Sequence, residues 1–332
     1  MRTGGTKTGH VIIFILGRLA LAGAVLWLVS LLVFVGCEVL PGDVAQVALG
    51  QYATPESVEA LRAQLGLNRP APERYLDWLG GMARGEWGRS ITTRTPVSDL
   101  LSERLRNTAT LAGVTTLVSV PLALGLGLLM ALWPGGVFDR TASVAVLALS
   151  ATPEFLIGTV AVLFFAVKLR WLPAVANVDP DFGLAKLARA LFLPVGTLTL
   201  VVTAQIARMT RAAVTNLLDL PFIEMARLKG VPHWRIIFVH ALVNVAGPLA
   251  NVVALNVAYL VSGVVVVETI FAYPGMARLM VDAVEARDLP VVQACAMLFC
   301  AAYVLLILAA DLVAVLFNPR ARGRVRSAGA RT

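Results

Sequence analysis

The chain has 332 residues, of which 58% are hydrophobic and 14% are charged. Soluble globular proteins contain about 25% charged and about 45–50% apolar residues, so this composition excludes an ordinary soluble domain and indicates an integral membrane protein. A net charge of +8 would suggest nucleic-acid binding in a soluble protein. In a membrane protein it reflects Lys and Arg that gather on the cytoplasmic side, and no nucleic-acid partner is expected.

Six runs with little or no charge are long enough to cross a bilayer, which takes about 20 residues. These runs are 19–37, 107–138, 141–167, 190–207, 241–267 and 289–310. Helices satisfy their own backbone hydrogen bonds in lipid, so we expect an all-α integral membrane protein with six transmembrane helices. The first run exceeds the apolar core of a signal peptide and has no small-residue cleavage site after it, so it is interpreted as a retained span.

Residues 1–37 are interpreted as a cytoplasmic N-terminus and the first span, and residues 38–106 as a periplasmic loop region. The stretch TPESVEALRAQLGL predicts a helix in this loop, because Thr54 can cap it and Pro55 suits its first position. A second helix is expected across residues 72–84. The loop is therefore predicted to form a small helical cap on the outer face.

Lys and Arg in the short loops predict the orientation of the spans. If the N-terminus is cytoplasmic, the inner segments hold most of the basic residues. The short outer loops then hold Lys168, Arg170, Lys186, Arg189, Arg278 and Arg287. This asymmetry predicts that both termini are cytoplasmic, including a basic tail at 318–332. The long loop 38–106 does not count, since long segments are exported whatever their charge.

A short polar segment, LDLPFIEMARLKG, interrupts the apolar chain between the fourth and fifth runs. Asp219 can cap a helix there, and Pro221 suits its first turn. Gly230 can end the helix in a left-handed conformation. The segment 219–231 therefore predicts a cytoplasmic helix of about ten residues, about 15 Å long and too short to span a membrane.

The charges of this short helix suit its dipole. Glu224 lies near the positive N-terminal end, and Arg227 and Lys229 lie near the negative C-terminal end. The remaining residues leave it amphipathic, and an isolated helix of this length is marginal in water. Either the rest of the chain and the lipid headgroups hold it, or a partner protein accepts it in a groove.

Polar residues within or between the spans are candidates for a translocation path or gate. Glu154 lies within the third run, where a carboxylate must face water, bond another helix, lie at the lipid edge or be protonated. Asn251 and Asn256 suit a hydrogen bond to another helix, or a position along the path. Pro274 and Gly275 predict a tight turn between the last two spans, either a plain surface turn or the start of a short helix returning toward the pore.

Catalytic and metal-binding patterns are absent from the sequence. It contains no HExxH, no GxSxG and no phosphate-binding G-x-x-x-x-G-K-[ST] motif. The three cysteines form no Cys-x-x-Cys pair and no cluster with His, so neither a zinc site nor a disulfide framework is expected. The chain is therefore predicted not to be an enzyme and to have no ATPase site, no catalytic residues and no metal site.

Several segments carry a resemblance to one family. In EMARLKG, Glu224, Ala226 and Gly230 stand at the positions of the EAA loop of ABC-importer permeases, with Met225 where that loop has Ala. The following HALVNVAGP resembles the continuation seen in permeases for peptides and nickel. LLVFVGCEVLPGD, ETIFAYPGMARLM and DLVAVLFNPR match in order, so residues 10–322 resemble the B-type permease subunit of dipeptide, oligopeptide and nickel ABC importers.

The resemblance implies a type I ABC-importer-like permease in the bacterial inner membrane, with a five-helix core at 107–317. It also implies that the segment near 219–231 is a coupling helix that contacts an ATPase. The residues expected to serve this coupling are Asp219, Glu224, Ala226, Arg227, Lys229 and Gly230.

The expected partners are a second homologous six-span permease subunit, two cytoplasmic ABC ATPase subunits, a periplasmic or lipid-anchored substrate-binding protein, and membrane lipid. No cofactor is expected in this chain, and ATP and Mg would be bound by the ATPases. The outer cap would either receive the binding protein or serve as a plain cover. Di- or oligopeptides are the expected cargo, with nickel, metal chelates or opines as the alternative. A self-sufficient secondary transporter would show internal symmetry or matching broken helices, which the sequence does not clearly show.

Overall fold

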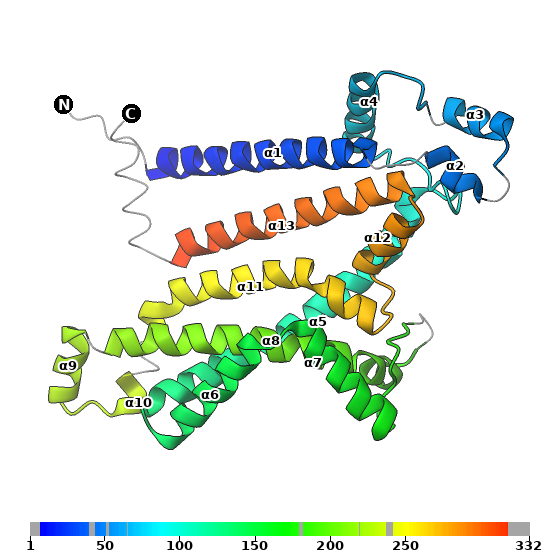
Figure 1. Cartoon of the computed structure of the whole chain (residues 1–332). Helices are drawn as coiled ribbons and strands as arrows, with labels where there is room; N and C mark the ends of the chain where they lie inside the picture. The colour runs from blue at the N-terminus through cyan, green and yellow to red at the C-terminus, as the bar shows by residue number, and fades with distance from the viewer. Residues whose placement is uncertain are drawn as a thin grey trace, which may run out of the picture. The chain divides into compact units, whose positions relative to one another are not determined.

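The computed structural model describes residues 7–39, 44–50, 53–64, 66–178, 182–218, 220–236 and 242–317. Throughout these ranges the regular elements are helices, drawn as coiled ribbons in Figure 1. One of them, η2 (Val162–Lys168), is a π-helix. The all-α prediction is confirmed. It is the result expected for apolar runs that must form all their backbone hydrogen bonds internally in lipid.

The chain divides into two compact units. The first contains the described residues within 1–18, 110–273 and 303–332, and the second those within 19–109 and 274–302. Three long helices pass from one unit to the other along the chain. They are α1 (Lys7–Val39), α5 (Val97–Leu132) and α13 (Leu289–Phe317).

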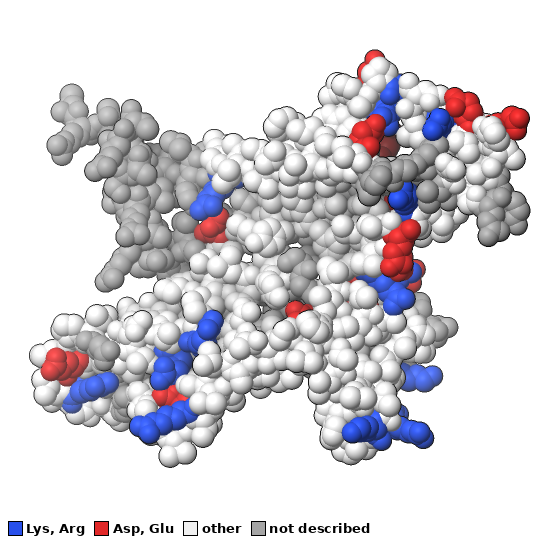
Figure 2. All heavy atoms as spheres, in the orientation of Figure 1, with Lys and Arg blue, Asp and Glu red and all other residues white. Residues whose placement is uncertain are grey.

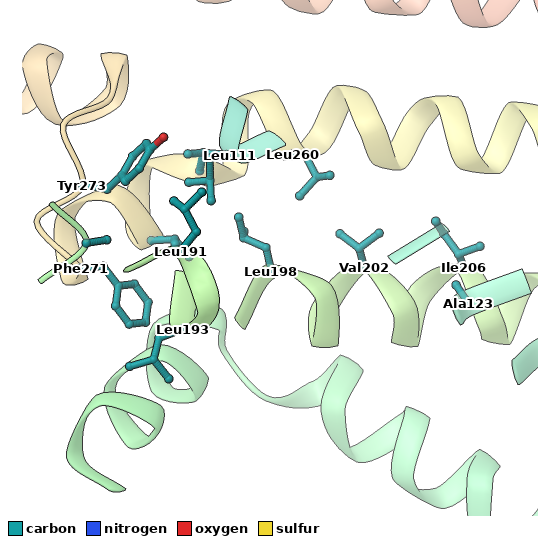
Figure 3. Close-up of a cluster of buried hydrophobic side chains, with 13 residues drawn as sticks. Leu111, Ala123, Leu191, Leu193, Leu198, Val202, Ile206, Leu260, Phe271 and Tyr273 are labelled. Atoms are coloured by element: carbon teal, nitrogen blue, oxygen red, sulfur yellow. The ribbon is translucent and has the colours of Figure 1, made fainter. Parts of the chain in front are cut away.

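The first unit is built around α8 (Leu184–Leu218), which packs against helices that precede it and helices that follow it in the chain. Its other elements are α6 (Val137–Ala151), α7 (Glu154–Ala161), η2, α9 (Pro221–Leu228), α10 (His233–Arg235) and α11 (Leu242–Ile270). Leu198, Val202 and Ile206 recur every four residues along α8 and so share one face of the helix. They belong to the same buried cluster as Leu260 of α11 (Figure 3).

Four helices are long and apolar enough to cross a membrane, and two bent pairs add further candidates. The four are Ile15–Val39, Val97–Leu132, Leu184–Leu218 and Leu289–Leu312. The pairs are Val137–Ala151 with Glu154–Lys168, bent by 100°, and Asn244–Leu260 with Val264–Ile270, bent by 42°. The six-span arrangement therefore stays a prediction, fulfilled if each bent pair is one span.

The apolar run at 141–167 is not a single straight helix, contrary to the expectation from its length. The chain turns sharply between α6 and α7, where Thr152 is extended, with φ −85° and ψ 128°. Proline disfavours the helical conformation of the residue before it and cannot donate the helical hydrogen bond. Pro153 therefore ends α6, and α7 begins at Glu154.

The second unit holds the short helices of the loop after α1, namely α2 (Val44–Leu49), α3 (Pro55–Gln64) and α4 (Ala71–Ala83), together with α12 (Met276–Glu285). Thr54 caps α3 as predicted, since its Oγ1 accepts the N–H of Ser57 at 3.2 Å. The Ser57 hydroxyl in return accepts the N–H of Thr54 at 2.9 Å, which completes a reciprocal cap. The predicted helix at 72–84 is α4, while the position of these helices on the outer face stays a prediction.

Candidate functional site

The short helix α9 lies within the predicted coupling segment, and its ends follow the local sequence. Pro221 occupies the first turn, as predicted, and Leu220 takes the N-cap position without a side-chain hydrogen bond. Asp219, the predicted cap, lies outside the described residues. Gly230 has a φ of +74°, which confirms its left-handed conformation.

The end of α9 is a Schellman motif. The N–H of Gly230 donates to the carbonyl of Arg227 at 2.9 Å, and the N–H of Val231 donates to that of Ala226 at 3.1 Å. These two bonds satisfy carbonyls that the end of a helix would otherwise leave open. Lys229 is the C-cap residue and lies just beyond the last helical residue, Leu228.

One residue of α9 anchors the helix to the first unit. Ile223 is fully buried, in a cluster with Val214 and Leu218 of α8 and with Val245 and Leu249 of α11. Ala226 is partly buried against the same cluster. The anchor joins α9 to α8, which precedes it, and to α11, so a displacement of α9 would act on both.

The opposite side of α9 is exposed and largely apolar. Phe222 is 45%, Met225 55% and Leu228 76% exposed, and the side chains of Glu224 and Arg227 are exposed between them. Large apolar side chains that remain exposed beside charges are typical of a surface that another molecule covers.

The charged residues of this segment are available to a partner. Glu224, Arg227 and Lys229 are all exposed. Within the described part of the chain none of them forms an ion pair. Negative and positive side chains lie close together along one short helix, so the exposed surface of α9 offers both acidic and basic contacts.

An ion pair fixes the end of α8 that leads into α9. Both Nε and Nη2 of Arg211 donate to the carboxylate of Asp139 on α6, the Nη2 bond measuring 2.6 Å. Asp139 is buried and also accepts the N–H of Gly135 at 2.8 Å. Neither residue of this pair was singled out from the sequence, although an acid at the start of an apolar run is a usable signal.

A glycine allows a close approach of α5 to the same part of α8. A Cβ built on Gly127 would lie 2.6 Å from the Cβ of Thr210 and 2.7 Å from the carbonyl oxygen of Ala207. Both distances are shorter than real side chains adopt, so no larger residue fits without moving a helix. The α9 end of α8 is thus held from two sides, by α5 and by α6.

Glu154 lies at the sharp bend, in the first turn of α7. One carboxylate oxygen accepts a hydrogen bond of 3.4 Å from the hydroxyl of Tyr259 on α11. The other is buried without a hydrogen-bond partner among the described residues. The acid therefore occupies a helix N-terminus rather than the middle of a helix.

Asn256 of α11 differs from expectation in its contacts. The Nδ2 of Asn256 donates to the carbonyl of Val252 in its own helix at 2.9 Å, and its Oδ1 is buried with no partner in the described part of the chain. The predicted bond from Asn256 to another helix is therefore not seen among the described residues. Asn256 lies three residues before Tyr259 and shares its helix face, whereas Asn251 is half-buried nearer the start of α11.

The turn at Pro274 and Gly275 opens a short helix, as one of the two sequence interpretations expected. Gly275 is the N-cap residue of α12. The side chain of Asn107 donates to the carbonyl of Pro274 at 2.9 Å, and the hydroxyl of Thr108 accepts the N–H of Met276 at 2.8 Å. Two neighbouring residues of α5 thus hold the turn, while its role as a gate stays a prediction.

A buried acid of the second unit was also missed by sequence reasoning. Asp288 precedes α13 and accepts hydrogen bonds from the hydroxyl of Ser90 and from the N–H groups of Ile91, at 3.1 Å, and Thr92, at 3.3 Å. These donors satisfy the oxygens of a carboxylate that is 3% exposed, as a buried polar group requires. Asp288 thereby attaches the loop before α5 to the start of α13.

A metal centre is not among the features of the described residues. They contain no group of three or more His, Cys, Asp or Glu side chains placed to hold a metal ion. The three cysteines are free, with Cys37 and Cys295 buried and Cys300 partly exposed.

Known proteins resemble the chain over most of its length. The family described as "Binding-protein-dependent transport system inner membrane component" matches residues 123–323, and the corresponding N-terminal family matches residues 11–112. The "Probable peptide ABC transporter permease protein y4tP" of Sinorhizobium fredii is 37% identical over 310 residues, which cover 93% of this chain and 99% of the relative. The glutathione transport system permease protein GsiC of Escherichia coli K12 is 33% identical over 297 residues, covering 90% and 94%.

A solved structure supports the fold. A chain of the MetNI methionine ABC transporter in an inward-facing conformation aligns with a TM-score of 0.51 at 19% identity, covering 67% of this chain and 98% of that one. At this identity the likeness concerns architecture alone, and it agrees with a type I importer permease. The matched families and relatives extend through α9 and the helices on either side of it, and the chain belongs to the inner-membrane permease family of binding-protein-dependent ABC importers.

Proposed function

We propose that this permease forms half of the translocation pathway of a peptide importer and that α9 is its coupling helix. The observation that carries the coupling role is the division of α9 into an anchored and an open side, with Ile223 fully buried and Leu228 76% exposed. A helix held this way transmits force from a partner bound to its open side into α8 and α11.

The partners follow from the family. ABC importer permeases work with ATPase and substrate-binding subunits. We assign this chain a second homologous permease subunit, two cytoplasmic ATPases that bind ATP and Mg, and an external binding protein, with both termini cytoplasmic. Phe222, Met225 and Leu228 would enter an apolar groove of the ATPase, while Glu224 and Arg227 would meet charged residues at its rim.

The coupling would run from the ATPase through α9 to the spans. When the ATPases close on nucleotide, the groove moves and α9 follows, since a ligand shifts a two-state protein toward the state that it binds better. The Asp139–Arg211 ion pair and the close contact at Gly127 would pass the motion from α8 to α6 and α5. Rigid packing transmits such displacements because packed interfaces deform little.

The pathway itself is assigned to the bend between α6 and α7. Glu154 would face it together with Asn256, and the turn at Pro274 and Gly275 would serve as a gate. The carboxylate would favour the ammonium group of a passing peptide. The Oε1 of Glu154, which lacks a partner among the described residues, supports this assignment.

A single substitution tests the coupling role. Leu228→Ser removes an apolar side chain worth about 1.5–3 kcal/mol when buried, so ATPase binding should weaken about tenfold or more. Leu76→Ser is the matched control, since Leu76 is 65% exposed on α4 and lies outside the coupling segment. Co-purification of the ATPases and uptake by the assembled transporter are the measurements. Equal ATPase retention in the two variants would refute the assignment.

The cargo is assigned as peptide because curated relatives of nearly full length are named as peptide and glutathione permeases. Uptake of labelled di- and tripeptides by the reconstituted transporter, with its binding protein, should exceed that of nickel or an opine. Selective uptake of nickel with no peptide uptake would replace the peptide assignment and leave the coupling assignment intact.

A further inference from the structure

A cavity of 560 Å³ lies at the opposite end of α8 from α9, where that helix and the loop before it meet. α8 has 35 residues and is long and apolar enough to cross a membrane. At about 1.5 Å per residue it covers about 50 Å. The cavity therefore belongs to the membrane boundary opposite the one at which α9 lies.

The described walls of this cavity carry positive charge. Arg170, Lys186 and Arg189 line it, and its described lining includes no acidic side chain. Two of the three cations are held in place, since Arg189 Nη2 donates to the carbonyl of Trp171 at 2.9 Å and the Lys186 ammonium lies 4.9 Å from the centre of the Phe182 ring. In Figure 2, blue atoms without red neighbours lie over the far end of the helix labelled α7 in Figure 1.

The loop that forms the cavity is built by hydrogen bonds. The N–H of Trp171 donates to the carbonyl of Phe165 at 2.9 Å, and that of Ala176 donates to the carbonyl of Phe271 at 2.8 Å. Arg170 has a φ of 55°, a left-handed conformation that residues with a Cβ disfavour. The chain adopts it at the point where the arginine side chain joins the cavity wall.

The surface around the cations is apolar. Trp171 is 62%, Leu184 87% and Phe192 62% exposed. Trp and basic residues beside exposed apolar side chains are typical of the membrane–water interface, where aliphatic stems and rings lie in the acyl region and charges reach the headgroups. These cations also run against the cytoplasmic bias of Lys and Arg, so the orientation rule does not account for them.

We propose that the cavity binds the phosphate of an anionic phospholipid, with phosphatidylglycerol as the probe. Arg170, Lys186 and Arg189 would bind the phosphate through charge-assisted hydrogen bonds, while Trp171 and Leu184 would contact the acyl chains. An acidic protein surface would match the charges equally well but would leave the exposed Leu184 and Trp171 without an explanation. The combination of cations and apolar residues therefore favours lipid.

The test uses the assembled transporter in nanodiscs of phosphatidylcholine with and without phosphatidylglycerol, and native mass spectrometry to count retained phosphatidylglycerol. Removing one cation should weaken retention about fivefold, and the triple variant Arg170→Gln, Lys186→Gln, Arg189→Gln should lose it. The control removes three exposed cations of the second unit, Arg84→Gln, Arg89→Gln and Arg94→Gln, and should retain the lipid. Melting temperatures in pure phosphatidylcholine check that both variants are folded.

Three results would overturn the proposal. The first is equal retention of phosphatidylglycerol by the wild type and the triple variant. The second is competition by soluble glycerol 3-phosphate at the same affinity, which would identify a site for free phosphate. The third combines two observations on the triple variant. It retains phosphatidylglycerol as the wild type does, but in pure phosphatidylcholine it loses the ATP hydrolysis that the binding protein stimulates. That combination would identify a surface for protein docking.

Discussion

The two ends of α8 carry different chemistry on one continuous helix. At the end that leads into α9, exposed apolar side chains alternate with charges of both signs above the buried Ile223. At the other end, three cations surround a cavity beside exposed Trp171 and Leu184. Mixed charge with an apolar ridge suits a protein groove, whereas cations beside an aromatic ring suit a phosphate at a membrane surface. A transmembrane helix can thus meet a protein at one boundary and lipid at the other.

The strongest test of this contrast is Ile223→Asp. Ile223 is fully buried among apolar side chains, so a carboxylate there would be desolvated without a partner and would cost about 3–5 kcal/mol. We expect α9 to detach, the ATPases to be lost on purification and uptake to fall more than tenfold. Retention of phosphatidylglycerol at the other end of α8 should be unchanged.

Ile223→Leu is the control for this substitution, because it keeps the apolar volume and should cost less than about 1.5 kcal/mol. Normal ATPase binding by the Ile223→Asp variant would show that α9 does not depend on its anchor. Loss of both ATPase and lipid binding would mean that the two ends are not independent.

A smaller effect on the same end is expected from Arg211→Gln. Asp139 is 2% exposed and would lose its charged partner while keeping the N–H of Gly135, so the unfolding free energy should fall by about 2–3 kcal/mol. Arg208→Gln is the matched control, since Arg208 is exposed on the same helix and forms no ion pair with a described residue. A melting temperature that falls equally in both variants would contradict a structural role for the ion pair.

Local features of the sequence predicted where individual helices begin and end. Pro221, Gly230 and Thr54 act within a few residues of their own positions, and their roles in ending or starting helices were predicted correctly. The all-α class followed from long apolar runs, which leave the backbone no other way to satisfy its hydrogen bonds in lipid. The exposed side of α9 was also expected from its amphipathic composition.

Features that depend on distant contacts were not predicted. Arg211 and Asp139 are 72 residues apart, and the packing of α6 on α8 alone brings them together. The prolines are a second example of a feature that the sequence alone does not predict. Pro121 and Pro194 lie inside continuous helices, whereas Pro153 separates two helices whose axes are bent by 100°. Composition does not distinguish these prolines, because neighbouring helices decide whether a broken hydrogen bond can be accommodated.

Gly230→Ala should have a moderate effect on the α9 end. A side chain at a φ of +74° costs about 1 kcal/mol or more, so the Schellman motif should loosen and ATPase affinity should fall about fivefold. Gly183→Ala is the control, because Gly183 has open space around its Cβ position and no positive φ. Titration of the purified ATPase against the reconstituted permease measures the change, and an affinity equal to that of the control variant would refute the role of the left-handed turn.

The smallest expected effect is at the cationic end, where Phe182→Leu removes an aromatic ring but keeps an apolar side chain. The ring attracts the Lys186 ammonium, and an exposed interaction of this kind is worth about 0.5–1 kcal/mol. Phosphatidylglycerol retention should therefore weaken about two- to fivefold, with ATPase affinity unchanged. Phe155→Leu provides the control, since Phe155 is an exposed aromatic residue of α7, outside the cavity lining, with no cation placed over its ring in the described structure. Equal retention in the two variants would mean that Lys186 needs no ring to hold it in the cavity, and a fall in ATPase affinity would mean that the two ends of α8 share one function.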